Sequence, residues 1–234
     1  MIPVAAANVT DSLQLTSINT RLPSRKAFTL AKEPQMAQID YYFSTLSPYT
    51  YIAGTRLEEM AARHGAQINY KPLDLMALFQ RTGGQPPKDR HPNRQAYRTH
   101  DMPRQARKAG LPLNMQPMFW PTNPAPSCYA VIAAAEAGGG DMGKLVHAFT
   151  RSVWADEKNI AEDDVIRSCL SEAGFDPALA DAGLLSSAET YAANLEEAVS
   201  AGAFGAPFYI VDGTEPFWGQ DRLDDLDLFL AGKL

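Results

Sequence analysis

The sequence has little cysteine: only Cys128 and Cys169 occur in 234 residues, and they are too far apart for a C-x-x-C motif. Neither has histidines or a further cysteine at the spacing of a zinc site, so no metal centre is expected. Each thiol is interpreted as a small core residue. This sparse usage fits a reducing cytoplasm, and it disfavours dithiol oxidoreduction, because "SPYT" (47–50) carries no sulfur.

Long apolar runs and an excess of basic charge are also missing. No stretch approaches the roughly 18 apolar residues of a membrane span, so no membrane association is expected. The formal net charge is -6, and no block of Lys and Arg alternates with aromatic residues, so nucleic acid is not an expected partner. With 45% hydrophobic residues, the chain is long enough for one substantial core.

The first 37 residues lack sustained periodicity, and they lack the charged start and apolar centre of a secretory signal. They are predicted to be a disordered or mobile extension. Their Arg, Lys and Ser content also allows an organelle transit peptide. Met36, just before the first strand-like run, allows an unstructured leader or a misplaced start site instead.

A strand, a helix and a second strand are predicted next. "IDYYFS" (39–44) is β-branched and aromatic, as in a strand buried on both faces. From Pro48 the apolar spacing becomes helical, with Ser47 at the capping position and Gly65 as the stop signal. "AQINYKPLDL" (66–75) is the second strand. The order predicts a parallel, right-handed βαβ unit.

The chain then changes to helical patterns without a strand candidate, up to about residue 200. "GAPFYIVDGTEPFWG" (205–219) follows as two strands joined at Asp212 and Gly213, before a last helix over 221–231. The helical patterns cover 94–109, 125–137, 141–154, 162–173 and 188–201.

This order predicts an α/β protein with a thioredoxin-like βαβ…ββα fold and a large all-helical insertion. The expected domains are a thioredoxin-like domain (38–75 and 202–234) and a helical insertion domain (76–201).

Two positions in the thioredoxin-like part suggest chemistry. Ser47 begins a helix, where backbone amides favour a nearby anion, although it could equally be only an N-cap. Pro207 precedes a strand and cannot donate to its ladder. We expect a cis bond after Ala206; an ordinary trans proline at a strand start is the alternative.

"FWGQDRL" (217–223) suggests a binding segment for an amino-acid head group. Asp221 could bind an ammonium group, and Arg222 with the helix amides could bind a carboxylate. Taken singly, Asp221 could instead be a helix cap and Arg222 a solvated charge.

Four stretches together resemble the 2-hydroxychromene-2-carboxylate isomerase family, relatives of the kappa-class glutathione transferases within the DsbA-like branch of the thioredoxin fold. The resemblance runs from about Ile39 to the end and is carried by "YYFSTLSPYTYIA", "TGGQPPKDRHPNRQAY", "NLEEAVSAGAFGAPFYIVDG" and "FWGQDRL". It implies a cytoplasmic, glutathione-dependent isomerase of aromatic hydrocarbon catabolism, such as naphthalene degradation. Dimers are common in the family, so a homodimer is also implied.

The implied reaction converts 2-hydroxychromene-2-carboxylate to trans-o-hydroxybenzylidenepyruvate. The glutathione thiolate would add to the ring-opened substrate, allow rotation about the former double bond, and leave again. A kappa-like glutathione transferase or peroxidase is the alternative enzyme. A non-catalytic thioredoxin-like binding module is the third possibility.

The resemblance also implies residue roles. Ser47 would be catalytic and would hydrogen-bond the glutathione sulfur. The backbone of Ala206, before cis-Pro207, would pair with the cysteinyl part of glutathione. Many relatives carry Asn where this chain has Gly84, so a contact from that side chain would be lost or supplied elsewhere. The γ-glutamyl end would be held by Asp221 and Arg222, in a segment shaped by Trp218, Gly219 and Gln220.

The implied substrate is a small aromatic carboxylate, which needs a cationic pocket with aromatic walls. Solvated charges and a hydrophobic helical core are the ordinary alternative for the residues that could line it. The candidates are Lys88, Arg90, Arg94, Tyr97, Trp120 and Asn123.

Overall fold

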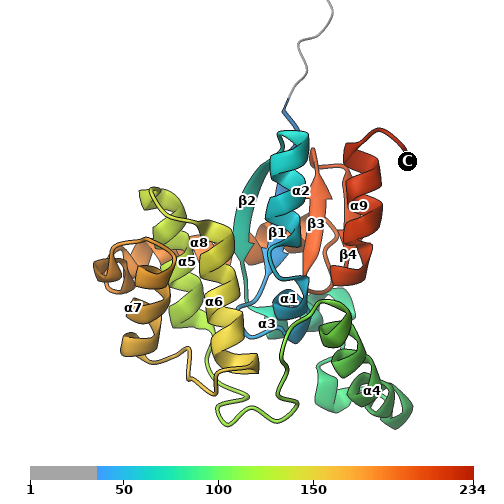
Figure 1. Cartoon of the computed structure of the whole chain (residues 1–234), viewed down its shortest axis with the longest axis horizontal. Helices are drawn as coiled ribbons and strands as arrows, with labels where there is room; N and C mark the ends of the chain where they lie inside the picture. Colours follow the sequence, from blue (N-terminus) through green and yellow to red (C-terminus); the bar gives the residue numbers. More distant parts are fainter. Residues whose placement is uncertain (1–35) are drawn as a thin grey trace, which may run out of the picture. The chain divides into compact units, whose positions relative to one another are not determined.

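The computed structural model of the chain describes residues 36–234, and its centre is a four-stranded sheet in the order β2-β1-β3-β4 (Figure 1). The extension predicted over 1–37 lies outside the described residues, except for the last two positions before β1. Strand β1 (Gln38–Phe43) pairs in parallel with β2 (Gln67–Pro72), as the βαβ prediction requires. Strands β3 (Phe208–Val211) and β4 (Glu215–Trp218) continue the sheet in antiparallel fashion.

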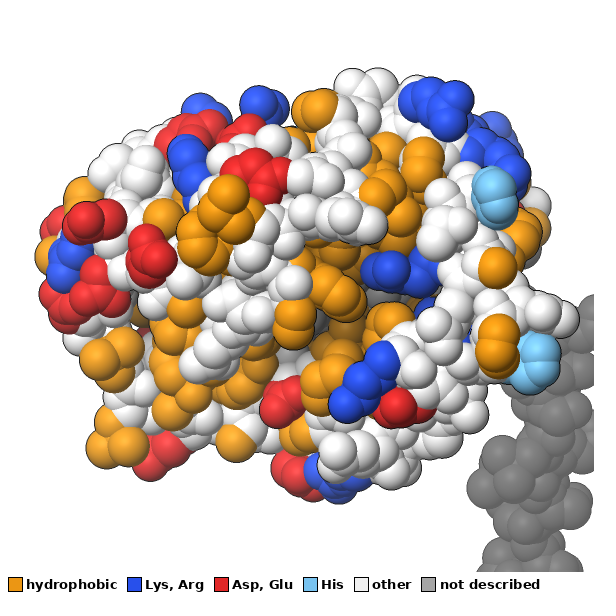
Figure 2. All heavy atoms as spheres, turned by 90° about the horizontal axis from the view of Figure 1, so that it is seen from below, with side chains coloured by type: hydrophobic (Ala, Val, Ile, Leu, Met, Phe, Trp, Pro, Cys, Tyr) orange, Lys and Arg blue, Asp and Glu red, His pale blue; other side chains and the backbone are white. Residues whose placement is uncertain are grey.

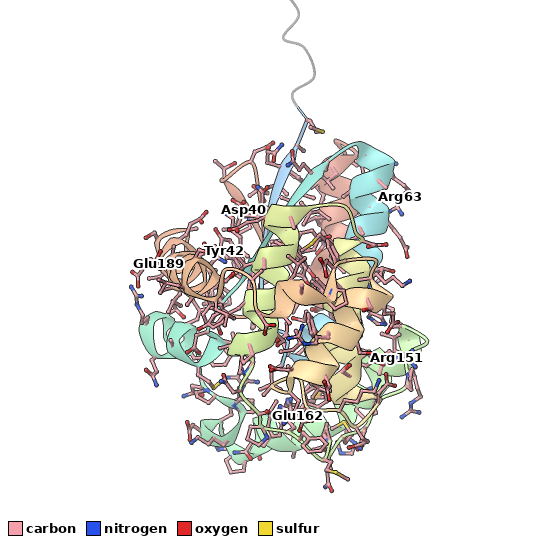
Figure 3. The ribbon with its side chains drawn as sticks, turned by 90° about the vertical axis from the view of Figure 1, so that its left-hand side faces the viewer. Asp40, Tyr42, Arg63, Arg151, Glu162 and Glu189 are labelled. Carbon is pink, nitrogen blue, oxygen red and sulfur yellow. The ribbon has the colours of Figure 1, made fainter. Side chains whose placement is uncertain are left out.

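Strand β1 is buried on both faces, which confirms the prediction from its composition. Tyr41 and Phe43 point into the larger core, whereas Tyr42 points into a smaller core with Phe208. Asp40 and Tyr42 lie on the side of the sheet that carries α8 (Leu184–Ser200; Figure 3). Two cores on either side of one sheet give the central strand no solvent-exposed face.

The segment after β1 contains two helices where the sequence predicted one. α1 (Pro48–Ala53) ends at Gly54, whose φ of 60° is accessible to glycine at little cost, and α2 (Arg56–His64) follows. The predicted end at Gly65 is confirmed, with a left-handed C-cap. The single-helix prediction was wrong because the apolar spacing continues across the break at Gly54.

The predicted second strand extended too far. It ends at Pro72, and α3 (Leu75–Thr82) begins directly afterwards. Asp74 is the N-cap of α3, and its side chain accepts hydrogen bonds from the amides of Met76 and Ala77 at 2.9 and 3.1 Å. This helix was not predicted: the predicted strand ended at Leu75, and residues 76–82 were assigned to no element.

The remaining helices agree with the predicted helical patterns within a few residues. They are α4 (Pro92–Lys108), α5 (Ala125–Ala137), α6 (Met142–Trp154), α7 (Asp163–Glu172), α8 and α9 (Leu223–Leu230), with 3-10 turns η1 (Pro87–Asp89), η2 (Pro177–Ala180) and η3 (Gln220–Arg222).

The helices cover the two faces of the sheet unequally. Side chains of α1, α2, α4, α5, α6, α7 and α9 share the larger core, and those of α3 and α8 share the smaller one. Figure 1 shows α5, α6, α7 and α8 as a group beside the sheet, with α4 on the opposite side. Within residues 36–234, no helix has both the length and the apolar character needed to cross a membrane.

Candidate active site

A cavity of about 1180 Å³ lies between α4 and the sheet end formed by β4 and η3. Residues from α1, α3 and the turn at 205–206 complete its lining. Figure 2 shows a hollow on this face, with hydrophobic side chains in its walls and Lys or Arg side chains at its edge. Its size and its mixed apolar and charged lining are typical of small-molecule sites.

The sheet wall brings together most of the residues expected to bind a head group. The Ala206–Pro207 bond is cis, which confirms the prediction, and Ala206 lines the cavity. A Cβ at Gly205 would lie 2.4 Å from Trp218 Nε1, so any other residue here would displace this indole. The Ala206 backbone forms no hydrogen bond with other residues of 36–234, so its amide and carbonyl can pair with a ligand. Trp218, Gly219, Gln220, Asp221 and Arg222 line the same wall.

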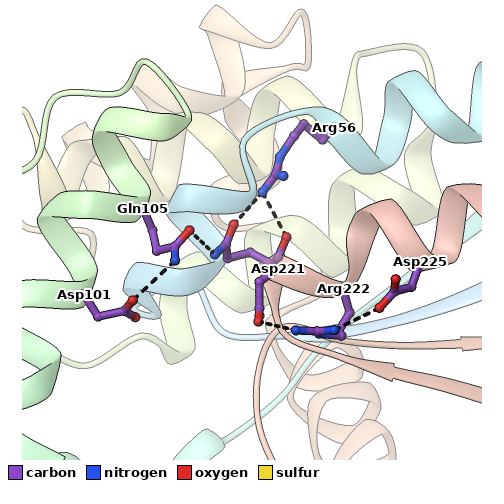
Figure 4. Close-up of polar contacts among 7 residues, drawn as sticks. Arg56, Asp101, Gln105, Asp221, Arg222 and Asp225 are labelled. Atoms are coloured by element: carbon purple, nitrogen blue, oxygen red, sulfur yellow. Dashed lines mark hydrogen bonds and ion pairs between the residues drawn. The ribbon is translucent and has the colours of Figure 1, made fainter.

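Asp221 and Arg222 are already paired with each other (Figure 4). The guanidinium of Arg222 lies 3.1 Å from the Asp221 carboxylate and 3.0 Å from that of Asp225. Both members of the first pair are about half exposed, so water screens the interaction. These three charges can therefore exchange partners with a zwitterionic head group at small cost.

Ser47 is an N-cap, as predicted, and it does not line the cavity. Its side chain accepts a hydrogen bond from the Thr50 amide at 3.2 Å, and the residue is 3% exposed. Its hydroxyl donates no hydrogen bond within residues 36–234. The hydroxyl proton therefore has no acceptor among the described residues at the start of α1.

The opposite wall is one face of α4. Arg94, Arg98, Asp101 and Gln105 line the cavity at intervals of four, three and four residues, which is the spacing of a single helical face. Arg90, just before α4, extends this wall, and Tyr97 borders it with a mostly exposed ring. Three arginines against one aspartate make this wall positive.

Tyr49 connects α1 with the α4 wall. Its hydroxyl donates to Asp101 Oδ2 at 3.2 Å, and the residue lines the cavity. Burial, followed by the charge of Asp101, raises the pKa of Tyr49 to about 12, although Arg98 and Arg90 oppose the shift. The phenol therefore stays neutral at physiological pH.

A buried amide joins the two walls (Figure 4). Arg56 donates to the carbonyl and side-chain oxygens of Gln220 at 3.0 and 2.6 Å, and Gln220 Nε2 donates to Gln105 at 3.3 Å. Gln105 in turn donates to Asp101 at 3.3 Å. This chain of hydrogen bonds fixes α4 relative to η3, so the spacing of the two walls is set by the protein.

Gly84 stands where a side chain would collide with the cavity wall. A Cβ there would lie 2.3 Å from the ring of Phe79 and 3.1 Å from the Phe204 carbonyl oxygen. The Phe79 ring lines the cavity, and the guanidinium of Arg90 lies over it at 5.9 Å from the centroid. The Phe79 ring, over which Arg90 lies, thus occupies the space into which a side chain at position 84 would extend.

Several predicted site residues lie elsewhere. The Trp120 ring packs 5.9 Å from that of Trp154, and Asn123 accepts from the Ala125 amide at the start of α5. The structure brings neither of these, nor Lys88, Pro207 or Ser47, into the lining of this cavity. Of the substrate candidates, Arg90, Arg94 and Tyr97 line it.

A larger set of lining residues was not predicted, although helical periodicity indicates those on α4. Once Arg94 is placed on the predicted helix, the residues one, two and three turns later share its face. The residues missed include Tyr49, Phe79, Arg98, Asp101, Gln105 and Asp225.

Neither cysteine is placed to act as a nucleophile. Cys128 and Cys169 are free and buried. Burial raises the pKa of Cys128 to about 11, against opposing hydrogen bonds from Thr45. A thiol of that pKa is protonated at neutral pH, which supports the interpretation of both residues as core positions.

Comparison with known proteins agrees with this geometry. The model of the DSBA-like thioredoxin domain family matches residues 38–231. A 2-hydroxychromene-2-carboxylate isomerase from Sphingobium xenophagum is 30% identical over 196 residues, which cover 82% of this chain and 97% of that protein. Glutathione S-transferase kappa 1 from Caenorhabditis elegans is 33% identical over 87 residues, 37% of this chain and 38% of that protein.

The solved structure of a 2-hydroxychromene-2-carboxylate isomerase is similar with a TM-score of 0.66 and 24% identity, over 83% of this chain and 95% of that one. This likeness supports the thioredoxin-like fold with its helical insertion. The family match and the isomerase relative show that the chain belongs to the 2-hydroxychromene-2-carboxylate isomerase family of DSBA-like thioredoxin proteins.

Proposed function

We propose that this protein is a glutathione-dependent isomerase that converts 2-hydroxychromene-2-carboxylate to trans-o-hydroxybenzylidenepyruvate. One observation carries the proposal. The unpaired backbone of Ala206 and the positive face of α4 border the same cavity. The first suits a peptide-like thiol, and the second suits an acidic substrate, so both reactants could meet there.

The sheet wall fits glutathione. The Ala206 amide and carbonyl would pair with the cysteinyl backbone, and Asp221 with Arg222 would take the ammonium and carboxylate of the γ-glutamyl end. Trp218 and Gly219 would shape this end. When bound, glutathione would supply a thiolate for transient addition to the ring-opened substrate.

Ser47 would stabilise that thiolate. Its oxygen is engaged with the Thr50 amide, but its proton is not used within residues 36–234. A hydroxyl that donates to sulfur favours the ionised form and so lowers the thiol pKa. Ser47 would thus keep its capping role while it donates to the sulfur.

The α4 wall would bind the substrate. Arg90 and Arg94 would face its carboxylate, and Tyr97 would border its ring. In this proposal the thioredoxin-like domain (38–75 and 202–234) holds glutathione, and the helical insertion domain (76–201) supplies the substrate contacts. We also propose a cytoplasmic location, because both cysteines are free thiols.

The test is turnover of purified protein with 2-hydroxychromene-2-carboxylate, followed by product absorbance with and without glutathione. We expect a rate only with glutathione, and no net consumption of it. Ser47→Ala should lower kcat about 100-fold, the order seen when one donor to a developing anion is removed. It should cost about 1 kcal/mol of stability as a lost cap.

Thr55→Ala is the matched control, because it removes a hydroxyl at the start of the next helix that makes no capping hydrogen bond. It should leave turnover unchanged. A rate independent of glutathione would contradict the proposal, and a Ser47→Ala enzyme as active as the native one would reduce Ser47 to a cap.

A kappa-like glutathione transferase is the second candidate, favoured by the similarity to the Caenorhabditis elegans protein. It would consume glutathione in step with an electrophilic aromatic substrate or a hydroperoxide. Measured loss of free thiol therefore separates the two activities. Ligand binding without any turnover would instead indicate a thioredoxin-like binding module.

A further inference from the structure

Arg98 is a half-buried cation on the cavity wall without a counter-ion. It projects from the middle of α4 into the cavity lining. The ion pairs among residues 36–234 involve other arginines, and the Arg98 side chain forms no hydrogen bond with these residues. Arg222 on the facing wall, by contrast, has two aspartate partners. A desolvated charge is costly unless an opposite charge compensates it.

A second arginine shares the neighbourhood of Arg98. Burial lowers the pKa of Arg98, and the positive charge of Arg90 lowers it further, whereas Tyr49 opposes the shift. Burial also lowers the pKa of Arg90, with Arg94 as the nearby like charge. Both guanidinium groups remain charged at any physiological pH, so the protein cannot relieve their repulsion by deprotonation.

The carboxylate nearest in the sequence is engaged elsewhere. Asp101 lies one turn after Arg98 but accepts hydrogen bonds from Tyr49 and Gln105 instead. Arg90 is fixed by its own contacts: Nε donates to the Gln85 carbonyl at 2.8 Å, and the Phe79 ring supports the guanidinium. Arg90 is thus held in place before any ligand arrives.

We propose that Arg98 is a specificity-determining residue that, together with Arg90, binds the carboxylate of the acidic substrate. This inference rests on the proposed function and assigns its anion subsite. A guanidinium can bind a carboxylate through two parallel hydrogen bonds, which fixes orientation as well as charge. The Tyr49 phenol, whose pKa is raised by burial and then by Asp101, borders the subsite in its neutral form and adds no negative charge to it.

The test is calorimetric titration of trans-2-hydroxycinnamate and of its uncharged methyl ester, without glutathione. The native protein should bind the acid at least ten times more tightly than the ester. Arg98→Gln should weaken acid binding about ten-fold and leave ester binding unchanged. Arg98→Lys should recover only part of the loss, because it restores the charge but not the two-pronged geometry.

Arg104→Gln is the matched control, because Arg104 lies on the same helix but lines a separate shallow groove with His100 and Arg107. It should bind both probes as the native protein does. Equal binding of acid and ester by the native protein, or binding of neither, would overturn the subsite. The proposal would also be overturned by an Arg98→Gln protein that keeps full selectivity for the acid, provided that its melting temperature shows it to be folded.

The anion subsite and the isomerase reaction can each fail without the other, and the measurements distinguish the two cases. Acid selectivity that depends on Arg98, in a protein without isomerase turnover, would support the subsite and reject the reaction. Turnover whose KM is unchanged by Arg98→Gln would support the reaction and reject the subsite.

Discussion

Two regions of this protein hold desolvated charges without counter-ions. The free-energy cost of such a charge can be relieved in a different way in each region. Where α2 packs on the core, the partly buried Glu58 accepts a hydrogen bond from Tyr70 at 2.9 Å, while its second oxygen has no partner among the described residues. In the cavity, Arg98 has no ion pair among the described residues, because the carboxylate of Asp101 on the same wall accepts hydrogen bonds from Tyr49 and Gln105 instead.

The difference follows from the chemistry of the two side chains. Burial raises the pKa of Glu58, so this group can become neutral by taking up a proton. Arginine has no such option near neutral pH. A closed core can therefore tolerate an unpaired glutamate, whereas unpaired arginines suit a cavity that an anion can enter.

The largest effect should come from adding a side chain at Gly84. Gly84→Ala would place a methyl group 2.3 Å from Phe79 and 3.1 Å from the fixed Phe204 carbonyl, so the Phe79 ring must move. We expect a loss of about 1–3 kcal/mol in the free energy of unfolding, as for other overpacked sites. Because Phe79 supports Arg90, acid binding should also weaken, which calorimetry and urea denaturation would measure.

The double variant Gly84→Ala/Phe79→Leu sharpens that test. The smaller side chain removes the collision, so stability should largely recover, but Arg90 loses its aromatic support and acid binding should stay weak. A Gly84→Ala protein with native stability and native acid affinity would show that this wall is not held by Phe79.

A smaller effect is expected in the core from Glu58→Gln. Because the folded pKa of Glu58 is raised, its stabilising contribution is complete below the unfolded pKa of about 4.3 and is lost as the pH rises through the folded pKa. Glutamine can accept the hydrogen bond from Tyr70 without a charge. The variant should therefore match the native protein at pH 4 and be more stable at pH 7.

Unfolding in urea at the two pH values would measure this difference. Acid binding at pH 7 serves as the control, and it should be the same in the variant and the native protein. A Glu58→Gln variant that is less stable at pH 7 would mean that the carboxylate is compensated in the core after all.

The sequence predicted the sheet wall well because its signals are local. The Ala206–Pro207 bond, the capping role of Ser47 and the strand pair around Gly213 each depend on a few adjacent residues. The break at Gly54 and helix α3 were missed, because apolar spacing alone does not distinguish one helix from two, or the end of a strand from the start of a helix.

The α4 wall was harder to predict, because its role depends on contacts distant in the sequence. Arg94, Arg98 and Gln105 share a helical face that the sequence shows, but which way this face turns depends on Gln220 and Tyr49. The place of Phe79 beside Gly84 likewise follows from packing between separate segments. Contacts between residues distant in the sequence form only when the chain folds, so local sequence patterns do not predict them.

The central claim is that one cavity binds glutathione on its sheet wall and an acidic substrate on its α4 wall at the same time. Titration of trans-2-hydroxycinnamate into the native protein, with and without saturating glutathione, tests it most directly. We predict a dissociation constant for the acid that changes less than about two-fold, since the walls are separate. If glutathione instead displaced the acid, as two ligands competing for one shared site would, the result would contradict the account.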